Sequence, residues 1–402
     1  MNILLGISAG IAAYKGPSIV RQFVKRGDEV RVVMTEGASE FVAPLSLQVV
    51  SENRVGSEVF DASYESEIGH IDLARWADVV LCAPATADLI ARMARGMGDD
   101  LLTTVILATR APVVVAPAMN TQMWEHPLVG ENVEKLAGTE GYRIVDPEAG
   151  ELACKEVGAG RMPDPPALVE AVVQATTDPI LAGERVLVTA GPTREHIDPA
   201  RMLTNPSTGK MGYAIAKAAQ QRGAEVTLVS GPTHLEAPAG VELVGVESAR
   251  QMHEAVLARV DQLDFVCKAA AVCDWRPKSS SDQKTAKSQM GARLELERNP
   301  DILAELGERF GPGGDEEGPT LIGFAAETHD VVDRARAKIA RKKAHLLVAN
   351  RVGGQESTFG ADQVRAHILT ETGTTSSFEP MSKVQLAGNL WRIAADYAQS
   401  RW

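Results

Sequence analysis

The chain has 402 residues, 45% hydrophobic and 23% charged, which is typical of a globular protein with two or three domains. Its net charge of −12 and lack of lysine- or arginine-rich runs argue against nucleic acid as a main partner. No apolar run reaches the length of a membrane span, and the apolar start at Ile3–Ile7 is too short for a signal peptide. We therefore expect a cytoplasmic protein that does not enter a membrane. The absence of CxxC spacing argues against a zinc site and a disulfide framework for the four cysteines, Cys82, Cys154, Cys267 and Cys273.

The first half alternates between strand and helix patterns. We predict a helix at residues 12–26 that ends at Gly27, another at 167–175, and strands at 2–7, 29–34, 78–82 and 112–116. Strands that are apolar on both faces are typical of a parallel sheet covered by helices. Residues 150–166 are rich in glycine and proline, so we expect a mobile flap there rather than a packed element.

The second half begins a new α/β pattern at Arg185. A long loop is predicted from the first strand to Asn205, and a polar loop that orders on ligand at 277–291. The predicted strands are 185–190, 225–230, 264–272, 320–325 and 346–349, and the predicted helices are 209–222, 249–259, 330–341 and 383–398. The fold class is α/β, with two Rossmann-like domains at 1–178 and 185–402 joined by a linker at 179–184.

Small and polar residues follow three predicted strands of the first half. Gly6, Ser8 and Gly10 surround the first turn, and the segments 83–88 (APATAD) and 117–120 (PAMN) end two further strands. The carboxyl ends of parallel strands are where open α/β sheets bind ligands, although the glycines alone also fit tight packing. A pyridine-nucleotide dehydrogenase would have a complete GxGxxG, and GISAGIAA lacks its third glycine.

Six segments of the first half, taken in order, resemble the flavin-dependent cysteine decarboxylases: GISAGIAAYK, MTEGASEFV, GHIDLARWADVVLCAPATAD, GMGDDLL, PAMNTQMW and ACKEVGAGRM. They are most similar to the decarboxylase half of the bifunctional phosphopantothenoylcysteine decarboxylase/phosphopantothenate–cysteine ligase family of coenzyme A biosynthesis. The resemblance implies a flavodoxin-like domain that binds FMN and no pyridine nucleotide. Loss of CO2 from an N-acylcysteine leaves an unstabilised carbanion, so the thiol is first oxidised to a thioaldehyde by hydride transfer to the flavin. The enethiolate formed by decarboxylation then takes the hydride back from the reduced flavin and accepts a proton.

By matching position, the resemblance assigns three catalytic residues. His70 is the catalytic imidazole, Asn120 binds the substrate carboxylate, and Cys154 on the flap donates a proton to the enethiolate. Taken singly, each also fits a structural role; Asn120, for example, could cap the helix after it. Lys155 departs from the family, which usually has glycine there. The candidate FMN-binding residues are Ser8, Gly10, Thr35, Ser39, Phe41, Ala85 and Thr86.

The second half offers anion-binding features of its own. The segment NPSTGKMG (205–212) opens a helix, where backbone amides can hold an anion, and AAAVCD ends a strand at the carboxylate of Asp274. Lys338 and Lys342 lie one helical turn apart, which suits a triphosphate but also an ordinary solvated helix face. Lys268 lies within an apolar strand, where an unpaired charge is costly, so we expect it to reach a sheet edge or a partner.

The segments LVTAGPTREHIDPARMLTNPSTGKMG, AAAVCDWRPK, NPDIL and GFAAET resemble the ligase half of the same family. The resemblance implies activation of 4'-phosphopantothenate by CTP as an acyl-cytidylate, with release of pyrophosphate, followed by attack of the cysteine amine. Asn205 would act on the acyl-cytidylate, and Mg2+ would be held mainly by the CTP phosphates, with Asp274 as the one protein candidate. Pro206, Thr208 and Arg351 depart from the family pattern. The residues implied to surround CTP are Asp274, Lys284, Asn299, Pro300, Asp301, Ile302, Phe324, Lys338 and Lys342.

The leading hypothesis is one enzyme with two consecutive steps, in which the ligase product is the decarboxylase substrate. The resemblance implies small-molecule partners and a homo-oligomer with a trimer-based decarboxylase core and dimeric ligase domains. The alternative is a non-catalytic regulatory flavoprotein of the same family. The joint presence of His70, Asn120 and Cys154 argues against that alternative.

Overall fold

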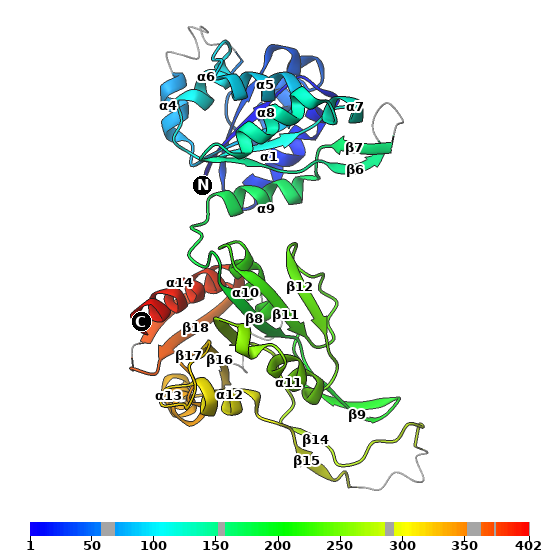
Figure 1. The fold of residues 1–402 in the computed structure, drawn as a ribbon, viewed down its shortest axis with the longest axis vertical. Helices are drawn as coiled ribbons and strands as arrows, with labels where there is room; N and C mark the ends of the chain where they lie inside the picture. Colours follow the sequence, from blue (N-terminus) through cyan, green and yellow to red (C-terminus); the bar gives the residue numbers. More distant parts are fainter. Residues whose placement is uncertain (58–68, 152–156, 286–292, 352–362, 374, 402) are drawn as a thin grey trace. The chain divides into compact units, whose positions relative to one another are not determined.

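The computed structural model of the protein describes residues 1–57, 69–151, 157–285, 293–351, 363–373 and 375–401. The chain divides into two compact units, Met1–Thr177 and Asp178–Trp402. The linker predicted at 179–184 begins just after this division. Each unit contains its own sheet and its own core (Figure 1).

The first unit is built on a five-stranded parallel sheet. In spatial order the strands are β2 (Glu29–Met34), β1 (Asn2–Ile7), β3 (Val79–Ala85), β4 (Val113–Pro117) and β5 (Tyr142–Ile144). The apolar side chains of β1 and β3 are buried on both faces, which explains the continuous hydrophobic runs in the sequence. The predicted parallel sheet is confirmed, and β3 extends three residues beyond its predicted end.

Helices cover both faces of this sheet. One face packs against α1 (Gly16–Lys25), α2 (Pro44–Ser51) and α9 (Pro165–Ala175). The other packs against α4 (His70–Trp76), α5 (Ala87–Arg95), α6 (Leu101–Ala108) and α8 (Pro127–Ala137). The helix predicted at 12–26 begins instead as a 3-10 turn, η1 (Ile11–Lys15), and α1 follows from Gly16, with Pro17 in its first turn.

The segment predicted as a flap contains regular structure. β6 (Glu148–Glu151) and β7 (Val157–Arg161) pair antiparallel and form a two-stranded arm (Figure 1). The expectation of a segment without packed elements is therefore wrong for the part of it that is described. Its glycines allow close packing against the sheet domain rather than loop structure.

The second unit is built on an eight-stranded sheet. Its first six strands are parallel, and β18 and β19 continue it antiparallel. The order is β12 (Val241–Gly245), β11 (Glu225–Ser230), β8 (Arg185–Ala190), β13 (Phe265–Lys268), β16 (Thr320–Glu327), β17 (Leu346–Arg351), β18 (Gln363–Thr370) and β19 (Thr375–Ser382). The predicted strand 264–272 ends at Lys268, and β12, β18 and β19 were absent from the prediction.

Two hairpins extend from this unit. β9 (Arg194–Asp198) and β10 (Arg201–Thr204) occupy most of the stretch predicted as a long loop before Asn205, so that prediction is wrong. β14 (Trp275–Pro277) pairs with β15 (Leu296–Arg298) on either side of the predicted polar loop.

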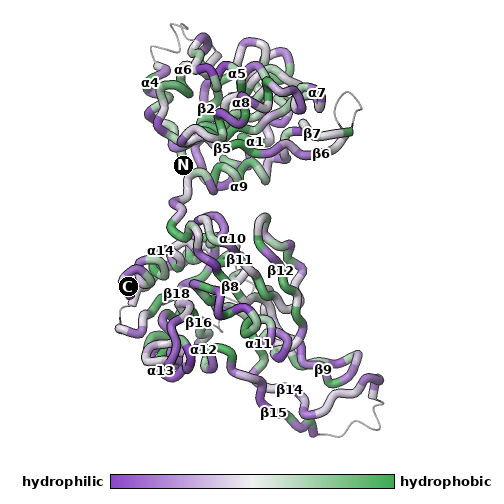
Figure 2. The backbone as a smooth tube through the Cα atoms, viewed as in Figure 1, coloured by the Kyte–Doolittle hydropathy of each residue, from purple (hydrophilic) through white to green (hydrophobic). Residues whose placement is uncertain are grey.

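Helices also cover both faces of the second sheet. One face carries α10 (Lys210–Gln220) and α14 (Lys383–Arg401), and the other carries α11 (Ala249–Leu257), α12 (Ile302–Phe310) and α13 (Val331–Lys342). Trp391 of α14 is fully buried, stacks edge-on against Phe265 at 5.8 Å and donates from Nε1 to the Ile215 carbonyl at 2.9 Å. Figure 2 shows hydrophobic segments running along the strands inside each unit. Among the helices that the structure describes, none has the length and apolar content needed to span a membrane.

Candidate active sites

A cavity of about 720 Å³ lies in the first unit at the carboxyl ends of β1, β3 and β4. Three predicted site residues, Gly10, Thr86 and Asn120, line it together with small side chains and several larger apolar ones. This size suits a cofactor such as a flavin. The other lining residues include Ala9, Ala12, Tyr14, Ala87, Ala118, Met119 and Met123.

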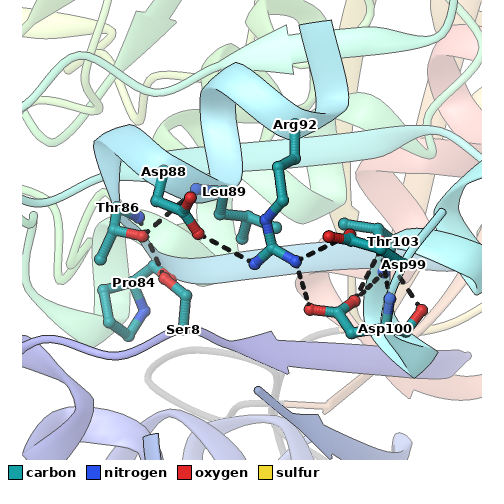
Figure 3. A network of polar contacts seen from close by, with 9 residues as sticks. All are labelled: Ser8, Pro84, Thr86, Asp88, Leu89, Arg92, Asp99, Asp100 and Thr103. Carbon is teal, nitrogen blue, oxygen red and sulfur yellow. Dashed lines mark hydrogen bonds and ion pairs between the residues drawn. The ribbon is translucent and has the colours of Figure 1, made fainter. Parts of the chain in front are cut away.

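Ser8 joins two of the strand ends at this cavity. Its buried hydroxyl donates to the Pro84 carbonyl at 2.8 Å and accepts from the Thr86 backbone N–H at 3.0 Å (Figure 3). Thr86 then caps α5, since its hydroxyl accepts from the Leu89 N–H at 3.4 Å. The small polar residue after β1 thus fixes the turn from β3 into α5, which forms one wall of the cavity.

The GMGDDLL segment is held by Arg92 of α5. The guanidinium contacts Asp88 at 3.0 Å, Asp99 at 3.1 Å and Asp100 at 2.7 Å (Figure 3). Asp100 also caps α6 by accepting from the Thr103 N–H at 2.7 Å. Burial works to raise the pKa of Asp100, but the hydrogen bonds from Thr103 and Arg92 outweigh it and lower that pKa. The GMGDDLL segment therefore fixes the connection between α5 and α6.

The arm formed by β6 and β7 packs against the turn that carries Asn120. The Met119 N–H donates to the Gly160 carbonyl at 3.0 Å, and a Cβ on Gly160 (φ +132°) would lie 2.3 Å from the Met119 carbonyl oxygen. A Cβ on Gly158 would likewise lie 2.5 Å from Thr121 Oγ1. Asn120 itself caps α7 (Thr121–Trp124) by accepting from the Gln122 N–H at 2.8 Å. Cys154, predicted as a catalytic residue, and Lys155 lie outside the described residues.

Lys15 is a cavity residue that sequence reasoning missed. Its ammonium donates to the Met162 carbonyl at 3.0 Å and to Asp164 at 2.8 Å, which ties η1 to the chain leaving the arm. The hydrogen bond from Lys15 lowers the pKa of Asp164. Arg161 lines the cavity beside it. The sequence signal that could have identified Lys15 is its position in the GISAGIAAYK segment, shortly after the first turn.

The remaining predicted residues of this unit are more dispersed. His70 is the first residue of α4 and is not among the residues that line the cavity. Thr35 is buried at the end of β2, and its Oγ1 has no hydrogen-bond partner among the described residues. Ser39 donates to the Glu36 carbonyl at 2.8 Å, Phe41 is exposed and Ala85 is buried. The small residues that line the cavity fit a planar ligand such as FMN, whereas Thr35 is not among the lining residues.

Two cavities meet in the second unit. One, of about 520 Å³, is lined by the NPSTGKMG segment and Asn350, and the other, of about 650 Å³, by the start of α12 and one face of α13. Both lie at the carboxyl ends of the central strands. They share five lining residues, Ala270, Val272, Asp274, Phe324 and Lys338.

Asn205 lies in the smaller of these two cavities. Its Nδ2 donates to the carbonyls of Ala271 at 3.2 Å and Val272 at 3.1 Å, which fixes the amide plane after β13. Gly209 adopts φ +77° at the start of α10, and a Cβ on Gly212 would lie 2.6 Å from Ala190 Cβ. Glycine at these two positions therefore lets the helix begin directly against β8.

The larger cavity gathers most of the residues predicted to surround CTP. Asp301 caps α12 by accepting from the Ala304 N–H at 3.1 Å, and its second oxygen pairs with Lys342. Lys338 donates to the Phe324 carbonyl at 3.0 Å, and burial lowers its pKa. Asn299 donates to the Cys273 carbonyl at 2.8 Å. Lys284 is exposed and does not line either cavity.

Cationic side chains predominate in the larger cavity. Five line it, Lys268, Arg298, Lys338, Arg341 and Lys342, against two carboxylates, Asp274 and Asp301. Such a lining fits a polyanionic ligand with a counter-cation. Arg298, Arg341 and Lys268 were not predicted here, because strand and helix patterns do not show which side chains converge. The expectation that Lys268 reaches a sheet edge is wrong, because β13 is an interior strand. Among the described residues, Lys268 Nζ donates no hydrogen bond.

Two family models match the chain. The one described as "Flavoprotein" matches residues 1–177, and the one described as "DNA/pantothenate metabolism flavoprotein C-terminal domain" matches residues 181–397. Together they cover both units.

Curated relatives match over nearly the whole chain. The coenzyme A biosynthesis bifunctional protein CoaBC of Vibrio cholerae is 51% identical over 353 residues, 87% of this chain and 87% of that protein. The protein of the same name from Escherichia coli is 44% identical over 394 residues, 97% of this chain and 95% of that protein. A crystal structure of the C-terminal domain of a CoaBC protein covers 56% of this chain and 100% of that chain, with 39% identity and a TM-score of 0.47.

Proposed function

The chain belongs to the family of coenzyme A biosynthesis bifunctional proteins, which join a flavoprotein decarboxylase to a ligase, and we propose how its two units divide the chemistry. The second unit ligates cysteine to 4'-phosphopantothenate with CTP. The first unit decarboxylates the product with FMN. The observation that carries this proposal is that each unit has its own cavity at the carboxyl ends of its strands, lined by three of the predicted residues in the first unit and by most of them in the second.

In the ligase unit, the cationic cavity would hold the nucleotide. Lys338, Lys342 and the α12 N-terminus offer donors to it, and Mg2+ carried by the phosphates would lie within reach of Asp274. A carboxylate is a poor electrophile, so the nucleotide provides its leaving group. Asn205, held by two strand-end carbonyls in the adjoining cavity, orients the acyl group for attack by the cysteine amine.

In the decarboxylase unit, small residues and the Ser8–Thr86 junction would hold FMN, which when bound accepts a hydride from the substrate and returns it. Asn120 holds the substrate carboxylate beside the arm. Cys154, which lies between β6 and β7 in the sequence, delivers a proton to the substrate carbon. Packing of Gly158 and Gly160 against the Asn120 turn supports this pairing, because it anchors the arm next to the carboxylate site.

We further propose that copies of the chain assemble to complete the flavin site. His70 does not line the cavity of its own unit, so a catalytic His70 would act in a neighbouring copy. Large apolar side chains are exposed in η1, in α2 and just after the 3-10 turn η2 (Glu36–Glu40), where a neighbour would cover them: Ile11, Tyr14, Phe41, Leu45 and Val49.

One experiment tests both activities. The purified full chain is given 4'-phosphopantothenate, CTP, Mg2+ and cysteine without any reductant. We expect a yellow protein that releases pyrophosphate and CO2 in equal amounts. A protein that stays colourless and inert after reconstitution with FMN, or that needs stoichiometric NADPH, would contradict the decarboxylase assignment. A yellow protein without either product would indicate a non-catalytic flavoprotein.

A further inference from the structure

Lys268 is a charged residue at the centre of the second sheet. It ends β13, where it pairs in register with Thr189 of β8 on one side and Gly323 of β16 on the other. Only 8% of the residue is exposed. A lysine in this position loses hydration on every side, which is costly for its ammonium form.

Among the described residues, no neighbouring group replaces the hydrogen bonds to water that the Lys268 amine has lost. Lys268 Nζ is buried and has no hydrogen-bond partner in the part of the chain that the structure describes. Val266, two residues earlier on the same face of β13, belongs to the apolar core under α12 and α13. Gly323 packs so closely below α12 that a Cβ there would lie 2.6 Å from Leu303 Cδ2. Lys268 therefore lies where α12 closes against the sheet.

Lys268 also lines the larger cavity of this unit. The titratable groups that line it with Lys268 come from four elements: Asp274 after β13, Arg298 of β15, Asp301 before α12, and Lys338, Arg341 and Lys342 of α13. Cys267 is its neighbour on the opposite face of the strand. Burial lowers the pKa of Lys268 to about 7. Without ligand, a substantial fraction of the amine is thus uncharged at neutral pH.

We propose that Lys268 is an additional cation of the nucleotide site, whose amine takes up a proton and donates to an anionic oxygen of CTP when the nucleotide fills the cavity. The proposal rests on the proposed function of this unit, because it takes CTP as the ligand. It accounts for the unsatisfied amine, since a phosphate oxygen would provide both the missing acceptor and the compensating charge. Binding and protonation are then coupled, so each stabilises the other.

Calorimetric titration of the full chain with CTP and Mg2+ tests this coupling. Titrations at pH 7.5 in buffers of different ionisation enthalpy give the number of protons taken up per bound CTP. We expect about 0.5 to 0.75 more proton for the native chain than for Lys268→Met, because a free amine with a pKa of about 7 is about three-quarters unprotonated at pH 7.5. The CTP affinity of Lys268→Met should be about tenfold lower at pH 6.5, and the two affinities should converge as the pH rises toward 9. Lys278→Met, which changes an exposed lysine, serves as the matched control.

The outcomes separate this proposal from the function on which it rests. Equal proton uptake and equal CTP affinity in the native chain and Lys268→Met would overturn the role of Lys268 while leaving the nucleotide site intact. Failure of the native chain to bind CTP would overturn the proposed function of this cavity as well. Thermal unfolding of Lys268→Met distinguishes lost binding from lost folding. Removing an unsatisfied buried amine should leave the apo protein as stable as the native chain, or more so.

Discussion

Ser8 and Thr86, 78 positions apart in the sequence, are joined by a hydrogen bond of 3.0 Å from the Thr86 backbone N–H to the Ser8 hydroxyl. Ser8→Ala leaves that partly buried N–H without its acceptor, at a cost of about 1–1.5 kcal/mol. We expect the turn into α5 to loosen and the dissociation constant of FMN to rise about tenfold or more. Flavin retained after dialysis measures this, with the exposed Ser18→Ala as control. Full flavin retention by Ser8→Ala would show that the junction does not shape the flavin site.

Gly160 allows the arm to approach the turn of Asn120. An alanine there would place its Cβ 2.3 Å from the Met119 carbonyl oxygen, so the arm must move. We expect Gly160→Ala to reduce CO2 release more than tenfold while pyrophosphate release is unchanged. Gly130→Ala is the matched control, because a Cβ at that helical position meets no atom within 4 Å. If Gly160→Ala decarboxylates at the native rate, packing of the arm is not needed for this step.

Cys154 is the predicted proton donor of the decarboxylation. A serine hydroxyl is a much weaker acid than a thiol, so Cys154→Ser should stop after CO2 loss with the oxidised product retained. Pyrophosphate release by the same sample provides an internal control for the ligase unit. Mass spectrometry should detect a product two hydrogens short of 4'-phosphopantetheine. Normal formation of 4'-phosphopantetheine would show that another group donates the proton.

Asn205 is oriented by hydrogen bonds to the carbonyls of Ala271 and Val272. Asn205→Ala should slow amide formation more than about tenfold, as expected for the loss of one well-placed hydrogen-bonding group. The acyl-cytidylate should accumulate after a burst of pyrophosphate. Quenched-flow analysis with labelled CTP detects it, and Asn389→Ala, which lies away from the cavities, is the control. Native turnover without accumulation would remove Asn205 from this role.

His345 makes the stability of the second unit sensitive to acid. Burial lowers its pKa from 6.5 to about 3, and its Nδ1 accepts from the Leu321 N–H at 2.9 Å, which requires the neutral ring. Below pH 6.5 the unfolded chain binds a proton that the folded chain does not, so stability falls as the pH drops toward 3. The slope approaches about 1.4 kcal/mol per pH unit for this group.

Thermal melts of the native chain and His345→Gln from pH 8 to pH 4 measure this contribution. The glutamine retains an acceptor for Leu321 but does not titrate. We expect the gap between the two melting temperatures to shrink or reverse as the pH falls. Parallel curves would show that His345 does not set the acid sensitivity.

The buried parallel strands could be predicted because burial on both faces makes them continuous apolar runs, as in Val79–Ala85. The parallel strands β5 and β12 are less buried and were not predicted. The strand β19 could not be predicted from the sequence, because its residues TSSFEPMS are mostly polar and include Pro380. An edge strand tolerates both features, because one side of it forms no ladder. The arm was wrongly predicted to be a flap without packed elements, because glycines that allow close packing have the same sequence pattern as glycines of a loop.

The candidate sites were predictable where a residue directly follows a strand. Thr86 directly follows β3 and Asn120 lies three residues after β4, and both line a cavity. Asp274 also lines a cavity, although β13 ends six residues before it. Lys15 and Lys268 were not predicted as site residues, because their positions depend on how a 3-10 turn and a central strand end against neighbouring elements. That information is tertiary, and no spacing in the sequence carries it.

The shared wall of the two cavities in the second unit has a consequence for how the ligase handles its intermediate. Asp274, Phe324 and Lys338 contribute to both chambers, so a molecule made from the nucleotide and the acid spans them without leaving the protein. We therefore expect the amine to attack the acyl-cytidylate where it forms, with no transfer of the intermediate between separate sites.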